Sequence, residues 1–171
     1  MLTLEEVAKQ PVEQRLGRMT RTADDLAAAI HGQNEAALMR RPDLKNWAAK
    51  EVICHLRDTE ELFMVRLEMI AAMDEPAFGA AGQGARVLAT PDRWAEDRQY
   101  LRNDAAEALN TFRKRREELL SHLRALSPKQ WQRGGIHPTR GRMTVDDYAT
   151  MIAWHDDNHL DQLRRALDGR V

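Results

Sequence analysis

Apolar residues recur along this chain at alternating spacings of three and four, the period of a helix that buries one face. The first such stripe consists of Val12, Leu16, Met19, Ala23, Leu26 and Ile30. Gly32 follows the last of these residues, and glycine is the residue that most often ends a helix. The pattern therefore predicts a helix from about Pro11 to Ile30.

Three more stretches have the same period, and they span about residues 48–73, 91–126 and 144–167. The connection before the first of them has room for at most one extra helical turn. Thr90 is the predicted N-cap of the second, and Thr144 with Asp147 forms a capping box at the start of the last. Four amphipathic helices and no strand pattern predict an all-α fold, an up-down-up-down four-helix bundle formed by a single domain, residues 1–171.

The last predicted helix presents two histidines where apolar core residues are expected. Its stripe consists of Val145, Tyr148, Ile152, His155, His159, Gln162 and Ala166. Side chains four apart lie on one helix face, so both imidazoles point inward and are close enough to bind one metal ion. The nearby Asp156, Asp157 and Asp161 are predicted to lie on the solvated flanks and back. Because zinc usually takes three or four protein ligands, a third ligand decides between a metal site and hydrogen-bonded core histidines.

His55 supplies that third candidate ligand. It shares a helix face with the polar Glu51 and Thr59 and with the apolar Ala48, Val52 and Leu62. Since burying polar groups without partners is costly, a polar centre in an apolar face indicates a built site. Three inward histidines on two helices thus favour a metal site, while structural histidines at a helix seam stay an alternative.

These residues also form a family pattern, which consists of Trp47, Glu51, Val52, His55, Leu56 and Asp58, followed much later by His155, His159 and Gln162. The pattern resembles the DinB and YfiT-like superfamily of metal-binding four-helix bundles, and the resemblance spans nearly the whole chain. It implies that His55, His155 and His159 bind a divalent metal, commonly zinc or nickel. It further implies a homodimer and the activity of a metal-dependent hydrolase or of a thiol-dependent transferase or isomerase.

Three imidazoles leave coordination positions for water or substrate, which is the arrangement of catalytic zinc sites. Such an ion could activate water for attack on an ester or amide, or lower the pKa of a thiol for transfer. Glu51 and Asp58 are the candidate catalytic residues, because they are placed to orient a histidine, complete the coordination or move a proton. For both, exposed helix charge is the alternative interpretation.

The sequence thus predicts a divalent-metal-dependent hydrolase or thiol transferase that acts on a small molecule, such as a low-molecular-weight thiol. The alternative is a non-catalytic metal-stabilised bundle that serves as a stress-related binding or dimerisation module. Two glycine-bearing stretches, residues 75–89 and 127–143, either shape the mouth of a pocket or are plain connecting loops. His137, in the second stretch, is the one histidine outside the cluster that merits a test.

Composition and charge limit the kinds of binding partner and the cellular location that we expect. The 171 residues are 43% hydrophobic and 31% charged, as expected of one folded domain, and the net charge of -1 argues against a dedicated nucleic-acid binder. The RKRR run at residues 113–116 precedes Glu117 and Glu118 and is therefore predicted to lie on a solvated face. No stretch is apolar enough for a membrane span or signal peptide, and the single cysteine, Cys54, fits a reducing compartment, so a cytoplasmic location is expected.

Overall fold

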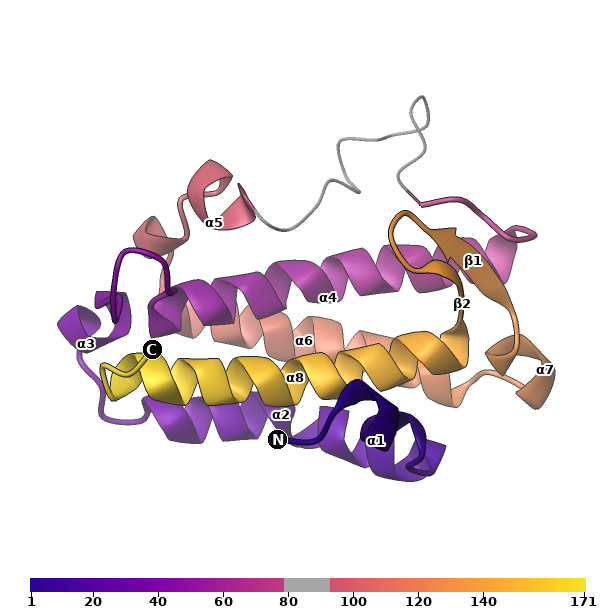
Figure 1. Cartoon of the computed structure of the whole chain (residues 1–171), viewed down its shortest axis with the longest axis horizontal. Coiled ribbons are helices and arrows are strands. Elements are labelled where there is room, and N and C mark those ends of the chain that lie inside the picture. Colours follow the sequence, from indigo (N-terminus) through magenta and orange to yellow (C-terminus); the bar gives the residue numbers. More distant parts are fainter. Residues whose placement is uncertain (79–92) are drawn as a thin grey trace.

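The computed structural model describes residues 1–78 and 93–171, and its centre is a bundle of four long helices (Figure 1). The bundle helices are α2 (Val12–Ile30), α4 (Ala49–Ala72), α6 (Ala105–Arg124) and α8 (Val145–Leu167). The shorter elements are α1 (Leu4–Ala8), α3 (Glu35–Met39), α5 (Trp94–Asp97), the 3₁₀ helix η2 (Tyr100–Arg102), α7 (Pro128–Trp131), β1 (Gly134–His137) and β2 (Gly141–Thr144). The predicted all-α class and four-helix bundle are confirmed. None of the helices within the described ranges is both long and apolar enough to cross a bilayer.

The order of helix directions differs from the prediction. Both α2 and α4 pack against α6 and α8. Helix α2 runs parallel to α8, because Arg15 contacts Asp146 while Thr22, further along α2, contacts Asp156. Helix α4 runs parallel to α6, because Lys50 at the start of α4 contacts Leu101 just before α6, while Glu60, further along α4, bonds to Arg116 of α6. The directions are therefore up, down, down and up, and the predicted up-down-up-down order is wrong.

The connection between α4 and α6 explains this order. Just after α4, the Phe78 amide donates to the Ile136 carbonyl at 2.9 Å, so that point lies beside β1 at the C-terminal end of α4. By η2 the chain is back near the N-terminal half of α4, where the Cys54 thiol meets the Tyr100 carbonyl. Because η2 lies near the N-terminal half of α4, α6 starts at the same end as α4.

The third predicted helix is interrupted. Gln99 has a left-handed φ of 50°, which separates α5 from η2, and Asn103 is extended. Helix α6 starts anew where the Asp104 carboxylate accepts the Glu107 amide proton at 2.8 Å. The predicted continuous helix is therefore wrong between residues 97 and 105, and its predicted start at residues 90–92 lies outside the described residues.

The 127–143 stretch, predicted to be irregular, contains a hairpin. Strands β1 and β2 pair antiparallel, with Gly135 opposite Met143, and Ala77 forms a parallel bridge to Ile136. Gly135 is required by a close approach, because a Cβ at this position would lie 2.5 Å from the Phe78 ring. The hairpin thus holds the chain that leaves α4 and positions Phe78 at this end of the bundle.

The predicted ends of α2 and α8 are correct. Thr144 and Asp147 form the expected capping box, with each side chain bound to the other's backbone amide. Gly32 and Gly169 follow the two helices with φ values of 75° and 68°, which a glycine adopts without strain. These local signals fix where α8, the helix with two candidate ligands, begins and ends.

Candidate metal centre

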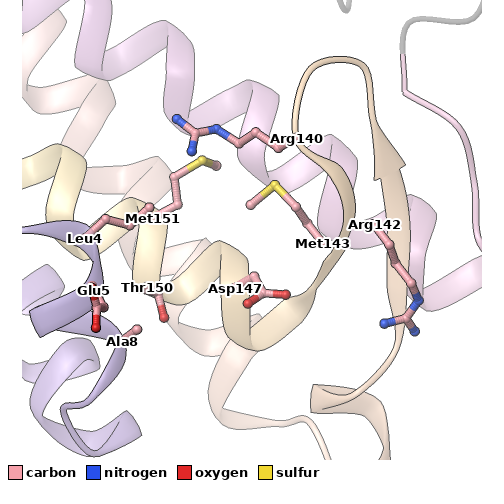
Figure 2. Close-up of a pocket in the computed structure, with 9 residues that line it drawn as sticks. All are labelled: Leu4, Glu5, Ala8, Arg140, Arg142, Met143, Asp147, Thr150 and Met151. Carbon is pink, nitrogen blue, oxygen red and sulfur yellow. The ribbon is translucent and has the colours of Figure 1, made fainter.

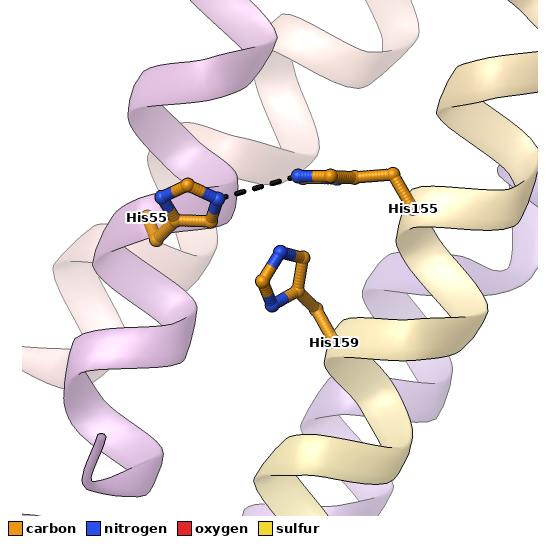
Figure 3. A group of neighbouring side chains, drawn as sticks. All are labelled: His55, His155 and His159. Atoms are coloured by element: carbon orange, nitrogen blue, oxygen red, sulfur yellow. Dashed lines mark hydrogen bonds between the residues drawn. The ribbon is translucent and has the colours of Figure 1, made fainter. Parts of the chain in front are cut away.

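The three predicted ligands meet between α4 and α8, two antiparallel neighbours in the bundle (Figure 3). His55 comes from α4, and His155 and His159 lie one turn apart on α8. One nitrogen from each ring can be chosen so that all three lie within 4.8 Å of one another. Residues a hundred positions apart in the sequence therefore form one cluster of imidazoles.

The spacing of these nitrogens fits a shared metal ion. The Nε2 atoms of His55 and His155 are 3.2 Å apart. Two imidazoles bound to zinc at 2.0–2.1 Å with a tetrahedral angle require a nitrogen separation of about 3.3 Å. The Nε2 atoms are the nitrogens that face each other, while the Nδ1 atoms of both rings are buried without a hydrogen-bond partner in the part of the chain that the structure describes. The donor set is three nitrogen ligands, which suits zinc or nickel.

All three rings are held in the neutral form that metal binding requires. Burial, together with the charge of His159, lowers the pKa of His55 from 6.5 to about 3. Burial also holds the pKa of His155 well below its usual range and lowers that of His159. Because a proton would compete with a metal ion for each nitrogen, these shifts favour coordination near neutral pH.

Neighbouring side chains orient the rings and cover them. The Nδ1–H of His159 donates to the side-chain oxygen (Oε1) of Gln162 at 2.7 Å, which leaves Nε2 free as a ligand. The Trp47 ring stacks on the His159 ring with 6.2 Å between the ring centroids. It is tilted against the His55 ring, with 4.8 Å between the centroids. Phe63 packs edge-on against His155 at 5.6 Å. The sequence pattern contained Trp47 and Gln162, but it gave no signal for Phe63.

The comparisons with known proteins agree with this geometry. The sequence profile of the DinB superfamily matches residues 18–163, most of the chain. The chain belongs to the DinB superfamily. An Oceanobacillus iheyensis relative named "Putative metal-dependent hydrolase" is 20% identical over 167 residues, which cover 95% of this chain and 89% of the relative. YfiT from Bacillus subtilis, which has the same descriptive name, is 23% identical over 115 residues, or 67% of this chain and 60% of YfiT.

A solved structure has the same fold as this DinB-superfamily chain. The structure of Bacillus subtilis YfiT superposes with a TM-score of 0.80 at 17% identity, covering 97% of this chain and 88% of the other. That protein is described as a probable metal-dependent hydrolase with an unusual four-helix bundle topology. The unusual topology is consistent with the up, down, down, up order of the helices found here.

Glu51, the first candidate catalytic residue, lies fully buried at the start of α4. Its Oε2 atom accepts from Arg41 Nε at 2.7 Å and from the Ala48 backbone amide at 2.9 Å, and a second Arg41 nitrogen bonds to Oε1. It makes no hydrogen bond to any of the three histidines. The structure thus places the carboxylate where it caps α4 and ties down the segment that carries Arg41.

Asp58, the second candidate, is also buried, and its carboxylate is surrounded by donors. It accepts from Arg57 Nε at 2.6 Å and from the Tyr100 hydroxyl at 2.9 Å, and Arg98 approaches to 2.7 Å. Burial raises the pKa of Asp58, but its arginine and tyrosine partners outweigh burial and lower it. The carboxylate therefore stays charged and joins α4 to α5 and η2, without a hydrogen bond to the histidines.

Two residues expected at the surface lie in the centre of the bundle instead. Asp156 and Arg116 are 0% and 2% exposed. Arg116 donates to both oxygens of Asp156 and, through Nε at 2.6 Å, to Glu60, while the Thr22 hydroxyl donates to Asp156. Two predictions are therefore wrong: that Asp156 lies on the solvated flank of its helix, and that the whole 113–116 run is solvated.

A signal for Arg116 was present in the sequence. The apolar stripe of α6 passes from Phe112 to Leu119, and the missing member of the stripe falls at position 116. Asp156 likewise interrupts a second apolar stripe of α8, which consists of Ala149, Ala153, Leu160 and Leu163. A charged residue in the gap of an apolar stripe is a sign of a buried ion pair, provided that a partner of opposite charge lies on a neighbouring helix.

The structure also has a groove of about 500 Å³ beside the hairpin (Figure 2). Its lining residues come from α1, from the hairpin and from the first two turns of α8, and they are Leu4, Glu5, Ala8, Arg140, Arg142, Met143, Asp147, Thr150 and Met151. None of the three histidines lines it, although Met151 precedes His155 by one helical turn. The groove is therefore adjacent to the three-histidine cluster along α8 and does not include it.

Proposed function

We propose that this chain is a metal-dependent hydrolase that acts on a small ester or amide, with His55, His155 and His159 holding a divalent zinc or nickel ion. The observation that carries the proposal is the convergence of three neutral imidazoles, two of them with Nε2 atoms 3.2 Å apart. A divalent ion held by three imidazoles supplies a Lewis acid with coordination positions left for water or substrate.

The chain's own residues have separate roles in this proposal. Gln162 orients His159 through the 2.7 Å hydrogen bond to Nδ1. Trp47 and Phe63 pack against the histidine rings and exclude water from their sides, which strengthens electrostatic interactions within the site. For Glu51 and Asp58 we propose positioning roles. Both carboxylates accept hydrogen bonds from arginines, and these bonds hold α4, the helix that carries His55, in place.

The decisive experiment is the metal content of protein purified without chelator or histidine tag, measured by elemental mass spectrometry. We expect about one equivalent of a divalent transition metal in the wild type and none in a variant with His55→Ala, His155→Ala and His159→Ala. His31→Ala is the matched control, because His31 is an exposed histidine at the end of α2. Equal metal in the wild type and the triple variant would contradict the assignment of the ligands.

A second measurement separates the enzyme from the alternatives. Metal-loaded wild type and the triple variant are incubated with panels of esters, amides and thiol conjugates. Metal-dependent cleavage of an ester or amide supports the hydrolase, and metal-dependent thiol transfer alone would replace it with the thiol transferase. One bound metal without turnover in any panel would favour the non-catalytic bundle, in which the ion only stabilises the fold. A cytoplasmic location and a homodimer stay predictions.

A further inference from the structure

The bundle contains a buried cation that has no counter-ion among the residues that the structure describes. Arg66 of α4 is only 5% exposed, and its Nε has no hydrogen-bond partner. Within residues 1–78 and 93–171, no carboxylate forms a salt bridge with it. Burial lowers the pKa of Arg66, whereas the paired carboxylates of Arg116 raise the pKa of that other buried arginine. Since a buried charge without a partner is costly, Arg66 calls for an explanation.

Arg66 lies in the same α4–α8 seam as the histidines, with Tyr148 and Phe78 beside it. The guanidinium carbon is 5.6 Å from the centroid of the Phe78 ring, and Phe78 packs edge-on against Tyr148 at 6.1 Å. Tyr148 is fully buried, and its hydroxyl makes no hydrogen bond of good geometry within residues 1–78 and 93–171, although it lies close enough to Arg66 to raise the pKa of the guanidinium. The Arg66 guanidinium and the Tyr148 hydroxyl therefore lie together, and the Nε–H and the O–H can both donate hydrogen bonds.

The position of this pair relative to the metal centre follows from α8. Tyr148 precedes His155 by about two helical turns, which is about 10 Å along the helix axis at 1.5 Å per residue. Phe63 lies between, because it contacts His155 and precedes Arg66 by one turn of α4. The path from Arg66 to the histidines along this seam therefore passes the Phe63 ring.

The surroundings of the pair carry positive charge. Burial lowers the pKa of His137 on β1, and the charges of Arg66 and Arg140 lower it further. Arg140 lies in the turn of the hairpin and lines the neighbouring groove (Figure 2). An anion that reaches this end of the seam thus meets a favourable field before it meets Arg66.

We propose that Arg66 and Tyr148 bind a carboxylate of the substrate, so that the substrate is a small carboxylic acid whose reacting group lies about 10 Å from that carboxylate. Only the reaction at the histidines rests on the proposed function, and the carboxylate site does not depend on it. One guanidinium matches a monoanion in charge, and Nε with one Nη forms the planar fork that a carboxylate accepts. A phosphate monoester carries up to two negative charges and calls for more donors than this apolar, aromatic surrounding supplies.

Binding is tested with simple anions on the full-length protein. The Nε–H signal of Arg66 is followed by ¹H–¹⁵N NMR at constant ionic strength, with acetate, the neutral acetamide and inorganic phosphate as probes. We expect a saturable shift with millimolar acetate, none with acetamide, and at least about tenfold weaker binding of phosphate. Tyr148→Phe is expected to weaken acetate binding severalfold. No saturable shift with acetate, or a preference for phosphate, would overturn the proposal.

Stability distinguishes a binding arginine from a structural one. Arg66→Met removes an unpaired buried charge and is expected to raise the melting temperature by about 2 °C or more in the absence of ligand. Arg116→Met, the matched control, removes a paired buried charge and is expected to lower it. A decrease in Arg66→Met as large as that in Arg116→Met would show that Arg66 has a structural role and would overturn the proposal.

Metal content separates this inference from the proposed function. Arg66→Met, with Arg66→Lys as the variant that keeps the charge, is expected to bind as much metal as the wild type. If the wild type binds acetate at Arg66 but no metal, the proposed function fails while the carboxylate site stands. If it binds metal but acetate leaves the Arg66 signal unchanged, the carboxylate site fails while the metal centre stands.

Discussion

The two buried polar regions of this bundle differ in how completely their groups are paired. At the centre, Arg116 binds Glu60 and Asp156, and Thr22 completes the set. In the seam between α4 and α8, Arg66 Nε, the Tyr148 hydroxyl and the Nδ1 atoms of two histidines make no hydrogen bond within residues 1–78 and 93–171. A network with all its members satisfied contributes to the fold, whereas unsatisfied buried groups cost stability unless a ligand completes them.

The comparison indicates which buried region lowers the stability of the fold in exchange for binding a ligand. Both regions include residues of α4 and α8 and both are buried, so burial alone does not separate structure from function. What separates them is the partner, since the central arginine meets two carboxylates and the seam arginine meets none among the described residues. The predictions below test this distinction.

Removal of the central arginine is expected to have the largest effect. In Arg116→Met, Glu60 and Asp156 stay buried without a counter-ion, which costs about 3–5 kcal/mol of the free energy of unfolding. Urea denaturation measures the loss. Arg113→Met is the matched control, because Arg113 forms only an exposed pair with Asp24 and its removal is expected to cost less than about 1 kcal/mol. Equal losses in the two variants would remove the distinction between the paired centre and the surface.

Metal binding to the histidines is expected to stabilise the folded protein. At a free zinc concentration a hundred times the dissociation constant, the free energy of unfolding of the wild type should rise by about 2.7 kcal/mol. The triple histidine variant should show no rise, as measured by urea unfolding with and without zinc. A rise of the same size in the triple variant would mean that zinc binds elsewhere.

The metal-free protein is expected to lose stability in acid because of the same histidines. Their folded-state pKa values lie below the unfolded value of 6.5, so below pH 6.5 the unfolded chain binds more protons. The stability is therefore complete above pH 6.5 and falls as the pH drops towards about 3, the pKa of His55. Each proton contributes up to about 1.4 kcal/mol per pH unit.

Urea unfolding between pH 7 and pH 4 in the presence of a chelator, with the pH range chosen to bracket the histidine titration, measures this slope. A variant with His55→Gln, His155→Gln and His159→Gln should have a clearly shallower slope, because glutamine does not titrate. A slope unchanged in this variant would assign the acid sensitivity to carboxylates.

The smallest effect is expected at Asp58. Tyr100→Phe removes one of several donors to a carboxylate that keeps its arginines, so it should cost about 1 kcal/mol of stability and leave the metal content unchanged. Thermal unfolding and elemental analysis measure the two quantities. A loss of bound metal in Tyr100→Phe would mean that Asp58 acts on the histidines through α4, in closer agreement with the catalytic role predicted for it.

The sequence by itself determined the helices and the set of candidate ligands. Helix positions follow from a local period and from end signals such as Thr144 and Gly169, and these depend on residues a few positions apart. The same period placed His155 and His159 on one inward face. The helical period of an earlier segment added His55, and the structure brings all three together.

The tertiary structure alone decided the direction of α6, the pairing of α4 with α8, and the partners of the buried charges. Glu51 and Asp58 share their helix with His55, yet Arg41 and Tyr100 from other segments bind their carboxylates. Arg66 has no such partner among the described residues, and nothing in its own segment reveals that. Helical period tells which face a residue occupies, whereas the charge that it meets there depends on contacts between distant segments, which only the folded chain specifies.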